Sequence, residues 1–333
     1  MSKLKVFHSN STNPWFNLAT EDWIFRDMDP QIPILFLWRN APTVVIGRFQ
    51  NPWAECDLDK MKQDQVKLTR RQSGGGAVYH DLNNSCFTFM SSKEDYSQKI
   101  NNQILVNALS KFDIKAIPSG RNDILVGDRK VSGSAFKETK DRKFHHGTML
   151  LKTDLSKLAS YLKPKKKKLE SKGINSVRSR VANLTEFYPD LDHEKLCLSI
   201  KESFIQYYQK DATEIYLDEK ELAKISKLNN YYEFLSNWNW RFGETPKFTH
   251  HLENHFPWGG VDVHLNSHKG MITKSVIFSD SLHPEMVEFL AKSLEGIRYQ
   301  KDEIFKNLQQ AIDGLPMYEQ EISEFRNWLV SEV

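Results

Sequence analysis

The sequence contains little cysteine. Its 333 residues include three cysteines, Cys56, Cys86 and Cys197, with no Cys-x-x-Cys pair and no cysteine–histidine spacing typical of zinc ligands. A fold held together by disulfides or by a cysteine zinc site is therefore disfavoured. We expect three packed free thiols in a protein of a reducing compartment.

Long hydrophobic runs are also missing. No window approaches the roughly 18 apolar residues that a membrane-spanning helix needs, and the N-terminal residues MSKLKVFHSN lack the apolar core of a signal peptide. The sequence thus predicts a cytoplasmic protein with no membrane partner.

Net charge of one sign is small. The 46 lysines and arginines and 43 aspartates and glutamates give a formal net charge of +3, so the overall charge does not demand a nucleic-acid partner. The charge is uneven, however, because residues 165–180 contain seven lysines or arginines and a single acid, Glu170. This cluster favours an anionic ligand nearby.

The length of the chain predicts two domains. We place a larger domain at residues 1–245 and a smaller one at residues 250–333. In the larger part the expected strands form hairpins and meanders with helices between them, which favours an α+β fold with a mostly antiparallel mixed sheet. A strand hairpin followed by helices predicts a small α+β C-terminal domain.

Local signals locate the elements. Asn13-Pro14 begins a helix that runs to about Met28, with Leu18 and Glu21 away from its buried face. A turn at Asn40-Ala41-Pro42 predicts a hairpin between residues 34–39 and 43–47. Residues 218–230 are polar enough for a linker, and residues 238–240 resemble a docking strand. Further helices are expected at 98–112, 155–162 and 192–208, and strands at 4–8, 66–70, 77–80, 85–90, 124–126, 130–132, 146–151, 260–265 and 271–279.

The segment RRQSGGGAVYHD, residues 70–81, is the most distinctive. Three consecutive glycines permit positive φ and leave the backbone N–H groups open to an anion, and arginines are well matched to phosphate or carboxylate. No Lys-Ser/Thr follows the last glycine and the glycine spacing is not that of a dinucleotide fingerprint. The segment also fits a glycine-rich hairpin with exposed arginines.

A second informative block covers residues 119–151. Lys130 lies at the foot of a tight hairpin, where it could stabilise the charge that develops as an acyl-adenylate forms, although hairpin lysines are usually solvated. Asn122-Asp123 could hold Mg²⁺ against phosphates, or simply form a turn. Packing or capping is the better interpretation of His145 and His146, which lack a third metal ligand.

A third segment, Ser176 to Asn183, places Arg178 and Arg180 on one side of an extended stretch. Together with the lysines at 165–168 it is either a basic flap that closes over a nucleotide or a solvated surface loop.

Taken together, these blocks resemble a known family. The segments RRQSGGGAVYHDLNNSCFTF, GRNDILVGDRKVSGSAFKETKDRKFHHGTMLL and KGINSVRSRVANL are similar, in order and spacing, to the signature segments of lipoate-protein ligases. PWFNLATEDWIF, FLWRNAPTVVIGRFQNPWAEC and PWGGVDVHL are also similar, so the resemblance covers nearly the whole chain. The hairpin between Asp123 and Lys130 is shorter than in some bacterial members.

The resemblance implies a biotin/lipoyl-ligase-like catalytic domain and a two-step reaction. Lipoate and ATP would give lipoyl-adenylate and pyrophosphate, and a lysine of an acceptor lipoyl domain would then take the lipoyl group. The acceptors implied are E2 subunits of 2-oxoacid dehydrogenases and the glycine cleavage H protein. Mg²⁺ is implied as activator and a monomer as the working form, with no tightly bound prosthetic group.

The resemblance also implies roles for residues. Lys130 matches the lysine that contacts the acyl carbonyl and the α-phosphate. The expected lipoate and nucleotide contacts are Arg71, Ser73, Gly74, Gly75, Gly76, Ala77, Val78, Tyr79, His80, Asn122 and Asp123, with Asp123 as the candidate Mg²⁺ ligand. The lipoyl tunnel would be lined by Leu18, Glu21, Trp38 and His80. The adenylate loop would be formed by Ser176, Val177, Arg178, Arg180 and Asn183.

Two other functions fit parts of the sequence. One is an acyltransferase of the same fold that uses an already activated lipoyl or octanoyl donor. The other is a basic binding module for a polyanion at residues 165–180, which is disfavoured because no aromatic and basic platform or recognition helix accompanies the cluster.

Overall fold

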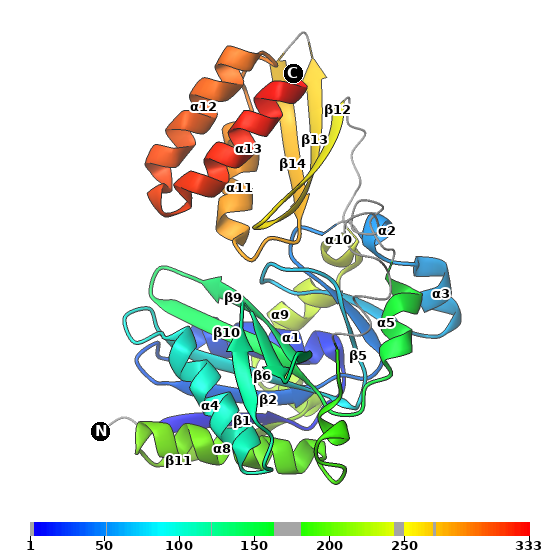
Figure 1. Cartoon of the computed structure of the whole chain (residues 1–333), viewed down its shortest axis with the longest axis vertical. Coiled ribbons are helices and arrows are strands. Elements are labelled where there is room, and N and C mark those ends of the chain that lie inside the picture. Colours follow the sequence, from blue (N-terminus) through cyan, green and yellow to red (C-terminus); the bar gives the residue numbers. More distant parts are fainter. Residues whose placement is uncertain (1–2, 51, 121, 163–180, 243–249, 269–270) are drawn as a thin grey trace. The chain divides into compact units, whose positions relative to one another are not determined.

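The computed structural model describes residues 3–50, 52–120, 122–162, 181–242, 250–268 and 271–333. The chain forms two compact units (Figure 1). The first comprises Met1–Val45, Pro52–Arg71 and Val78–Arg241, and the second comprises Ile46–Asn51, Gln72–Ala77 and Phe242–Val333. Two short segments from the N-terminal half therefore belong to the same unit as the C-terminal domain.

The first unit is built on an eight-stranded mixed sheet of order β11-β1-β2-β6-β10-β9-β8-β7. Strands β11, β1 and β2 are parallel to one another and the other neighbouring pairs are antiparallel, so the predicted α+β class with a mostly antiparallel mixed sheet is confirmed. The strands are β1 (Leu4–Ser9), β2 (Ile34–Arg39), β6 (Asn84–Ser92), β7 (Ala116–Ser119), β8 (Asp123–Val126), β9 (Arg129–Glu138), β10 (Arg142–Leu150) and β11 (Ala212–Leu217).

Apolar side chains cover both faces of this sheet. One core combines residues of α4 (Gln98–Ser110) and α8 (His193–Tyr208) with one face, and a second core combines α1 (Pro14–Asp27) and α9 (Ser226–Ser236) with the other. The caps expected for α1 and α8 are present, since Asn13 Oδ1 accepts from Trp15 N at 3.1 Å and Asp192 Oδ1 accepts from Lys195 N at 2.7 Å.

A small sheet of order β4-β3-β5 completes the strands of this part of the chain. It contains β3 (Thr43–Ile46), β4 (Lys67–Arg70) and β5 (Val78–His80). The helices α2 (Pro52–Glu55) and α3 (Leu58–Gln63) lie between β3 and β4 in the sequence, and α5 (Leu155–Tyr161) packs near α3 and β5. The predicted hairpin between residues 34–39 and 43–47 is therefore wrong. Strand β2 pairs with β1 and β6 in the large sheet, and β3 pairs in the small one.

Two further predictions are wrong. Residues 218–230 are not a linker, because they contain a 3₁₀ helix (Glu219–Ala223) and the beginning of α9. Leu228 and Leu235 of α9 are fully buried. Residues 238–240 belong to a helix, α10 (Trp238–Arg241), and not to a strand. Strands β9 and β10 are also longer than expected, and His145, which precedes the strand expected at residues 146–151, lies inside β10 together with His146.

Helix α1 is fixed at both ends by distant residues. At its start, Ser11 Oγ and Asn13 Nδ2 donate to the carboxylate of Glu219 at 2.7 and 3.0 Å. At its end, the guanidinium of Arg142 on β10 is buried and donates to the carbonyl oxygens of Ile24 and Met28 at 3.0 and 3.1 Å. Met28 N already donates to the carbonyl oxygen of Ile24, so Arg142 adds a second donor there and caps the carbonyl of Met28 beyond the last helical turn.

Among its described residues, the second unit has a three-stranded antiparallel sheet and three α-helices. The sheet order is β12-β13-β14, with β12 (His250–Phe256), β13 (Gly259–His268) and β14 (Met271–Ser279), and α11 (Pro284–Ser293), α12 (Lys301–Gly314) and α13 (Glu319–Glu332) pack against it (Figure 1). Alternate residues of β13, Val261, Val263 and Leu265, enter the core with the helices, so Asp262 and His264 lie on the opposite face.

Candidate active site

One row of side chains crosses five strands of the large sheet. Trp38 is paired with Cys86, Cys86 with Thr148, Thr148 with Gly133, and Gly133 with Asp123. Directly paired residues present their side chains on the same face of a sheet. With neighbouring strands about 4.8 Å apart, the row spans roughly 19 Å from β2 to β8. Its central members, Cys86, Thr148 and Gly133, are small.

Helix α1 supplies a buried carboxylate to this face. Glu21 Oε1 accepts a hydrogen bond from Thr88 Oγ1 at 2.6 Å, and Nδ1 of His146 lies 2.9 Å from the same oxygen. The indole N–H of Trp38 donates to Thr88 Oγ1 at 3.3 Å. The expectation that Glu21 points away from the buried face of α1 is wrong, because nearly the whole circumference of this helix is buried. A polar network thus fixes Trp38, and Leu18 belongs to the same apolar cluster.

His80 is held as a neutral imidazole of one tautomer. Asn17 Nδ2 donates to Asn40 Oδ1 at 2.9 Å, which turns the amide nitrogen of Asn40 toward His80 Nδ1 at 3.2 Å. Because an amide NH₂ group can only donate, Nδ1 accepts and the proton of His80 is on Nε2. Burial, and then the positive charge of Arg71 and of His146, lowers the pKa of His80 to about 3. Within the described residues Nε2 has no hydrogen-bond partner, so it offers a buried donor to a ligand.

Both arginines before the glycines are buried, contrary to the interpretation as exposed side chains. Arg70 donates to the carbonyl oxygens of Trp240 and Arg241 at 2.9 and 3.1 Å, so it fixes α10. Arg71 donates to the carbonyl oxygen of Val45 at 3.2 Å. Burial lowers the pKa of Arg71 to about 10 while the charge of Glu21 opposes the change, and the guanidinium therefore stays positive near neutral pH.

The other end of the row carries Lys130. Its Nζ lies 2.7 Å from Asp123 Oδ1, and both side chains are about one-third exposed. The ammonium also lies over Gly133, where a Cβ would come within 3.0 Å of Nζ. The absence of a side chain at Gly133 therefore lets the lysine lie close to the sheet. Asn122, on the same edge, is tied by its Nδ2 to the carbonyl oxygen of Ser134 at 3.0 Å.

Most of the expected adenylate loop lies outside the described residues, including Ser176, Val177, Arg178 and Arg180 and the lysines at 165–168. The described chain resumes beside Lys130, because Ala182 N donates to the carbonyl oxygen of Lys130 at 2.9 Å. Asn183 is fully occupied locally, since its side chain accepts from Thr153 N at 2.9 Å and donates to Thr153 O at 3.0 Å.

The glycine segment belongs to the second unit from Gln72 to Ala77, which includes Ser73. There Gly75, with φ of 93°, donates its N–H to the carbonyl oxygen of Ser281 at 2.7 Å. A Cβ at Gly74 would lie 2.1 Å from that same oxygen. In this structure the glycines permit a close approach of two protein segments. Beyond them in the first unit, Tyr79 is buried with its ring 5.5 Å from that of Tyr161, and Val78 is half-buried.

Two members of the polar network, Thr88 and His146, were missed by the sequence analysis. His146 is one of two adjacent histidines on β10, and alternation along a strand sends the pair to opposite faces. His145 packs among Phe87, Phe89 and Phe136 on the other face, as expected for a packed histidine. The expected packed free thiols are also confirmed, since Cys56, Cys86 and Cys197 are buried and form no disulfide.

Comparison with known proteins agrees with this arrangement. Residues 13–205 match the model of the lipoyl protein ligase A/B catalytic domain, and residues 245–329 match that of the bacterial lipoate protein ligase C-terminus. A lipoate-protein ligase A of Psychrobacter cryohalolentis is 51% identical over 336 residues, which cover 99% of each chain. Among the described helices, none has the length and apolar character needed to cross a membrane.

Solved structures show the same relationship. The structure of P. falciparum LipL1 in complex with lipoate superimposes with a TM-score of 0.87 at 34% identity, covering 98% of this chain and 99% of that one. A lipoate-protein ligase A bound with ATP gives a TM-score of 0.64 at 30% identity, covering 73% of this chain and 99% of the other. The chain therefore belongs to the lipoate-protein ligase family, with both the A/B catalytic domain and the C-terminal domain of its bacterial members.

Proposed function

We propose that this protein activates lipoate with ATP and transfers the lipoyl group to a lysine of an acceptor lipoyl domain. The observation that carries the proposal is the row of small side chains on one sheet face, with Trp38 at one end and the Lys130–Asp123 pair at the other. Such a row suits an extended substrate whose apolar tail and anionic head need different surroundings. Full-length similarity to lipoate ligases supports the same substrate.

In the first step an oxygen of the lipoate carboxylate attacks the α-phosphorus of ATP. The bond to the bridging oxygen breaks, and pyrophosphate leaves with the negative charge. No protein nucleophile takes part, so the protein contributes alignment and charge neutralisation. Lys130 suits this role, because its ammonium is held by Asp123 at 2.7 Å and the missing side chain of Gly133 lets it lie close to the sheet.

In the second step the neutral ε-amine of the acceptor lysine attacks the carbonyl carbon of lipoyl-adenylate. The bond to the adenylate oxygen breaks, AMP leaves, and the nitrogen loses a proton to give the amide. Charge again develops on oxygens between the acyl group and the α-phosphate. The same lysine can stabilise both steps from one position.

The apolar tail of lipoate would occupy the face near Leu18 and Trp38. Both side chains are buried and belong to one apolar cluster, and Thr88 fixes the indole of Trp38. Burial of the acyl chain contributes about 0.8 kcal/mol per methylene group. The Nε2–H of His80 and the charge of Arg71 provide the nearby polar groups.

The nucleotide would be held by Asn122, Asp123 and the adenylate loop. Asp123 fits Mg²⁺, since a carboxylate that is one-third exposed is the kind of ligand that Mg²⁺ takes beside phosphate oxygens, and the ion supplies positive charge to the phosphates when bound. Anion contacts from Gly74–Gly76 require the hydrogen bond between Gly75 and Ser281 to be exchanged.

We further propose E2 subunits and the H protein as acceptors, a monomer as the working form, and action in the cytoplasm.

A test of the function replaces Lys130 by alanine. We expect ligation to fall on the order of 10²–10³-fold, as when one oxyanion-stabilising donor is removed, with the fold retained because the side chain is one-third exposed. The matched control is Lys143→Ala, which removes a lysine of β10 that is also about one-third exposed and pairs with Glu138. Pyrophosphate release is measured with free lipoate and ATP, and acceptor modification by mass spectrometry.

These readouts separate the alternatives. Pyrophosphate release by the wild-type chain supports a ligase, whereas modification that occurs solely from a pre-activated lipoyl or octanoyl donor indicates the transferase. If Lys130→Ala and Lys143→Ala both ligate at the wild-type rate, the role assigned to Lys130 is wrong.

A further inference from the structure

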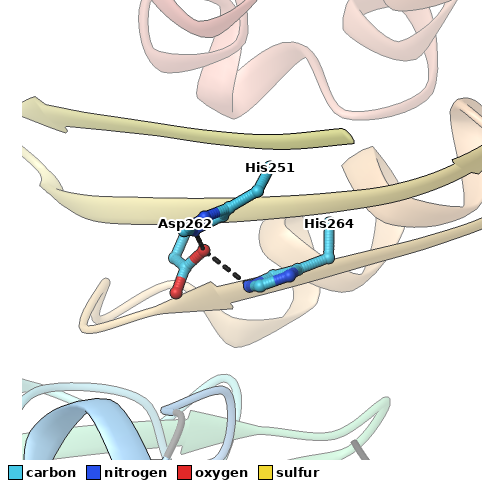
Figure 2. A group of neighbouring side chains, drawn as sticks. All are labelled: His251, Asp262 and His264. Atoms are coloured by element: carbon cyan, nitrogen blue, oxygen red, sulfur yellow. Dashed lines mark hydrogen bonds and ion pairs between the residues drawn. The ribbon is translucent and has the colours of Figure 1, made fainter. Parts of the chain in front are cut away.

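Three side chains with metal-ligating atoms converge on the sheet of the second unit, away from its helices. His251 projects from β12, and Asp262 and His264 project from β13 (Figure 2). One ligand atom of each residue lies within 4.8 Å of those of the other two. We propose that these residues form a binding site for a zinc-class divalent metal ion.

The strand register explains why the three side chains meet. His251 is paired with His264, and Glu253 with Asp262, so four side chains form a two-by-two arrangement on one face. The imidazoles of His251 and His264 stack with their centroids 4.5 Å apart. Glu253 Oε1 lies 3.3 Å from His251 Nε2, which makes it available as a fourth ligand.

Two of the donor atoms lie within hydrogen-bond distance of the third. Nε2 of His251 and Nε2 of His264 lie 2.6 and 2.7 Å from the same oxygen, Oδ1 of Asp262. In a tetrahedral zinc site with metal–ligand distances of about 2.0–2.1 Å, neighbouring ligand atoms are roughly 3.3 Å apart. An expansion of about 0.6 Å would therefore admit the ion. His251 can provide it by rotation, because its side chain is 51% exposed.

The ligand chemistry selects the class of metal. Imidazole nitrogen suits zinc, nickel, cobalt and copper, whereas magnesium and calcium prefer oxygen ligands. Asp262 and Glu253 add two carboxylates to the two imidazoles, so a divalent cation would balance the charge of the carboxylates. The largely buried position of Asp262, with 9% of its side chain exposed, would limit competition from water.

The test uses the full-length chain without an affinity tag, after chelator treatment and without nucleotide. Co²⁺ is titrated and the visible absorption of a tetrahedral complex is followed, and Zn²⁺ affinity is then measured by competition. The wild-type chain should bind one Co²⁺ that Zn²⁺ displaces and Mg²⁺ does not. Bands from thiolate ligands should be absent, since the cysteines are buried.

Two variants and one control decide the outcome. His251→Ala should keep the fold, because the side chain is half exposed. The substitution should weaken Co²⁺ and Zn²⁺ binding by about tenfold or more, since the loss of a residue that only hydrogen-bonds to a metal ligand already weakens binding by about tenfold. Asp262→Asn should do the same. His250→Gln alters the neighbouring histidine, which stacks on Tyr299, and should bind like the wild type. Absence of the absorption band in the wild-type chain, or equal affinities in wild type and His251→Ala, would overturn the proposal.

Discussion

Replacing His145 by leucine should reduce the loss of stability on acidification. His145 is fully buried in β10, and its ring centroid lies 4.9 Å from that of Phe136. Neither ring nitrogen has a hydrogen-bond partner among the described residues. Burial, followed by the charge of His146, lowers the pKa of His145 from 6.5 to about 3.

The sign follows from proton binding. Between pH 6.5 and 3 the unfolded chain binds a proton at His145 and the folded chain does not, so acidification favours unfolding. The contribution of the neutral imidazole is complete above pH 6.5 and declines as the pH falls. At pH 5 the loss amounts to about 2 kcal/mol. This is a substantial part of a total stability of roughly 5–15 kcal/mol.

The assay is urea unfolding followed by tryptophan fluorescence at several pH values from 7.5 to 5.0. The wild-type chain should lose about 2 kcal/mol more than His145→Leu over this interval. Phe136→Leu serves as the control, because it alters the same ring cluster without removing a titrating group. Its free energy of unfolding should be lower by a similar amount at every pH.

The comparison between variants isolates His145 from His80 and His193, whose pKa values burial also lowers, to about 3 and about 4. If the wild-type chain and His145→Leu lose stability in parallel from pH 7.5 to 5.0, burial does not keep His145 neutral and the reasoning fails.

Two further substitutions test contacts of the site. In thermal unfolding, Gly74→Ala should lower the stability of the second unit by about 1–3 kcal/mol, because its Cβ would meet the carbonyl oxygen of Ser281 at 2.1 Å. Gly76→Ala should unfold like the wild type, since the nearest atom to its Cβ would be 4.0 Å away. Thr88→Val should cost about 1–3 kcal/mol in urea unfolding and raise the KM for lipoate, since Trp38 and Glu21 both lose a partner, whereas Thr88→Ser should keep both contacts. Equal stabilities within either pair would contradict the corresponding contact.

Local signals predicted the elements whose boundaries are set by neighbouring residues. The cap at Asn13 and the proline after it determine the start of α1, and the cap at Asp192 determines that of α8. The turn at residues 40–42 shows that the chain changes direction, but it carries no information on the partner of each strand. Strand β2 is buried along most of its length and pairs with strands distant in the sequence, which the turn could not reveal.

Composition misled the prediction for residues 218–230. The segment is rich in charged and amide side chains, yet Leu228 and, just beyond the segment, Leu235 are buried in the core, and Tyr231 and Tyr232 pack against it. Widely spaced apolar residues in a polar stretch are easily taken for a linker, although two helical turns bring them to the same face.

The candidate site could be predicted only in part, because a single sequence does not display which strands pair. Lys130, Glu21 and Trp38 were identified through motifs, but their placement depends on the register of five strands. Thr88 and His146 belong to no motif and gain their importance from contact with Glu21. Pairing over long sequence distances determines such contacts, and a single sequence does not display it.

The anchoring of α1 at its two ends has a consequence for the evolution of acyl specificity. Glu219 holds the start of the helix and Arg142 holds its end, and neither anchor is among the residues expected to line the acyl chain. Changes at Leu18 or at the facing strand positions can therefore alter the length or width of the acyl site without shifting the helix backbone. A search for variants that accept unnatural carboxylic acids should keep Glu219 and Arg142 constant and diversify the residues between them.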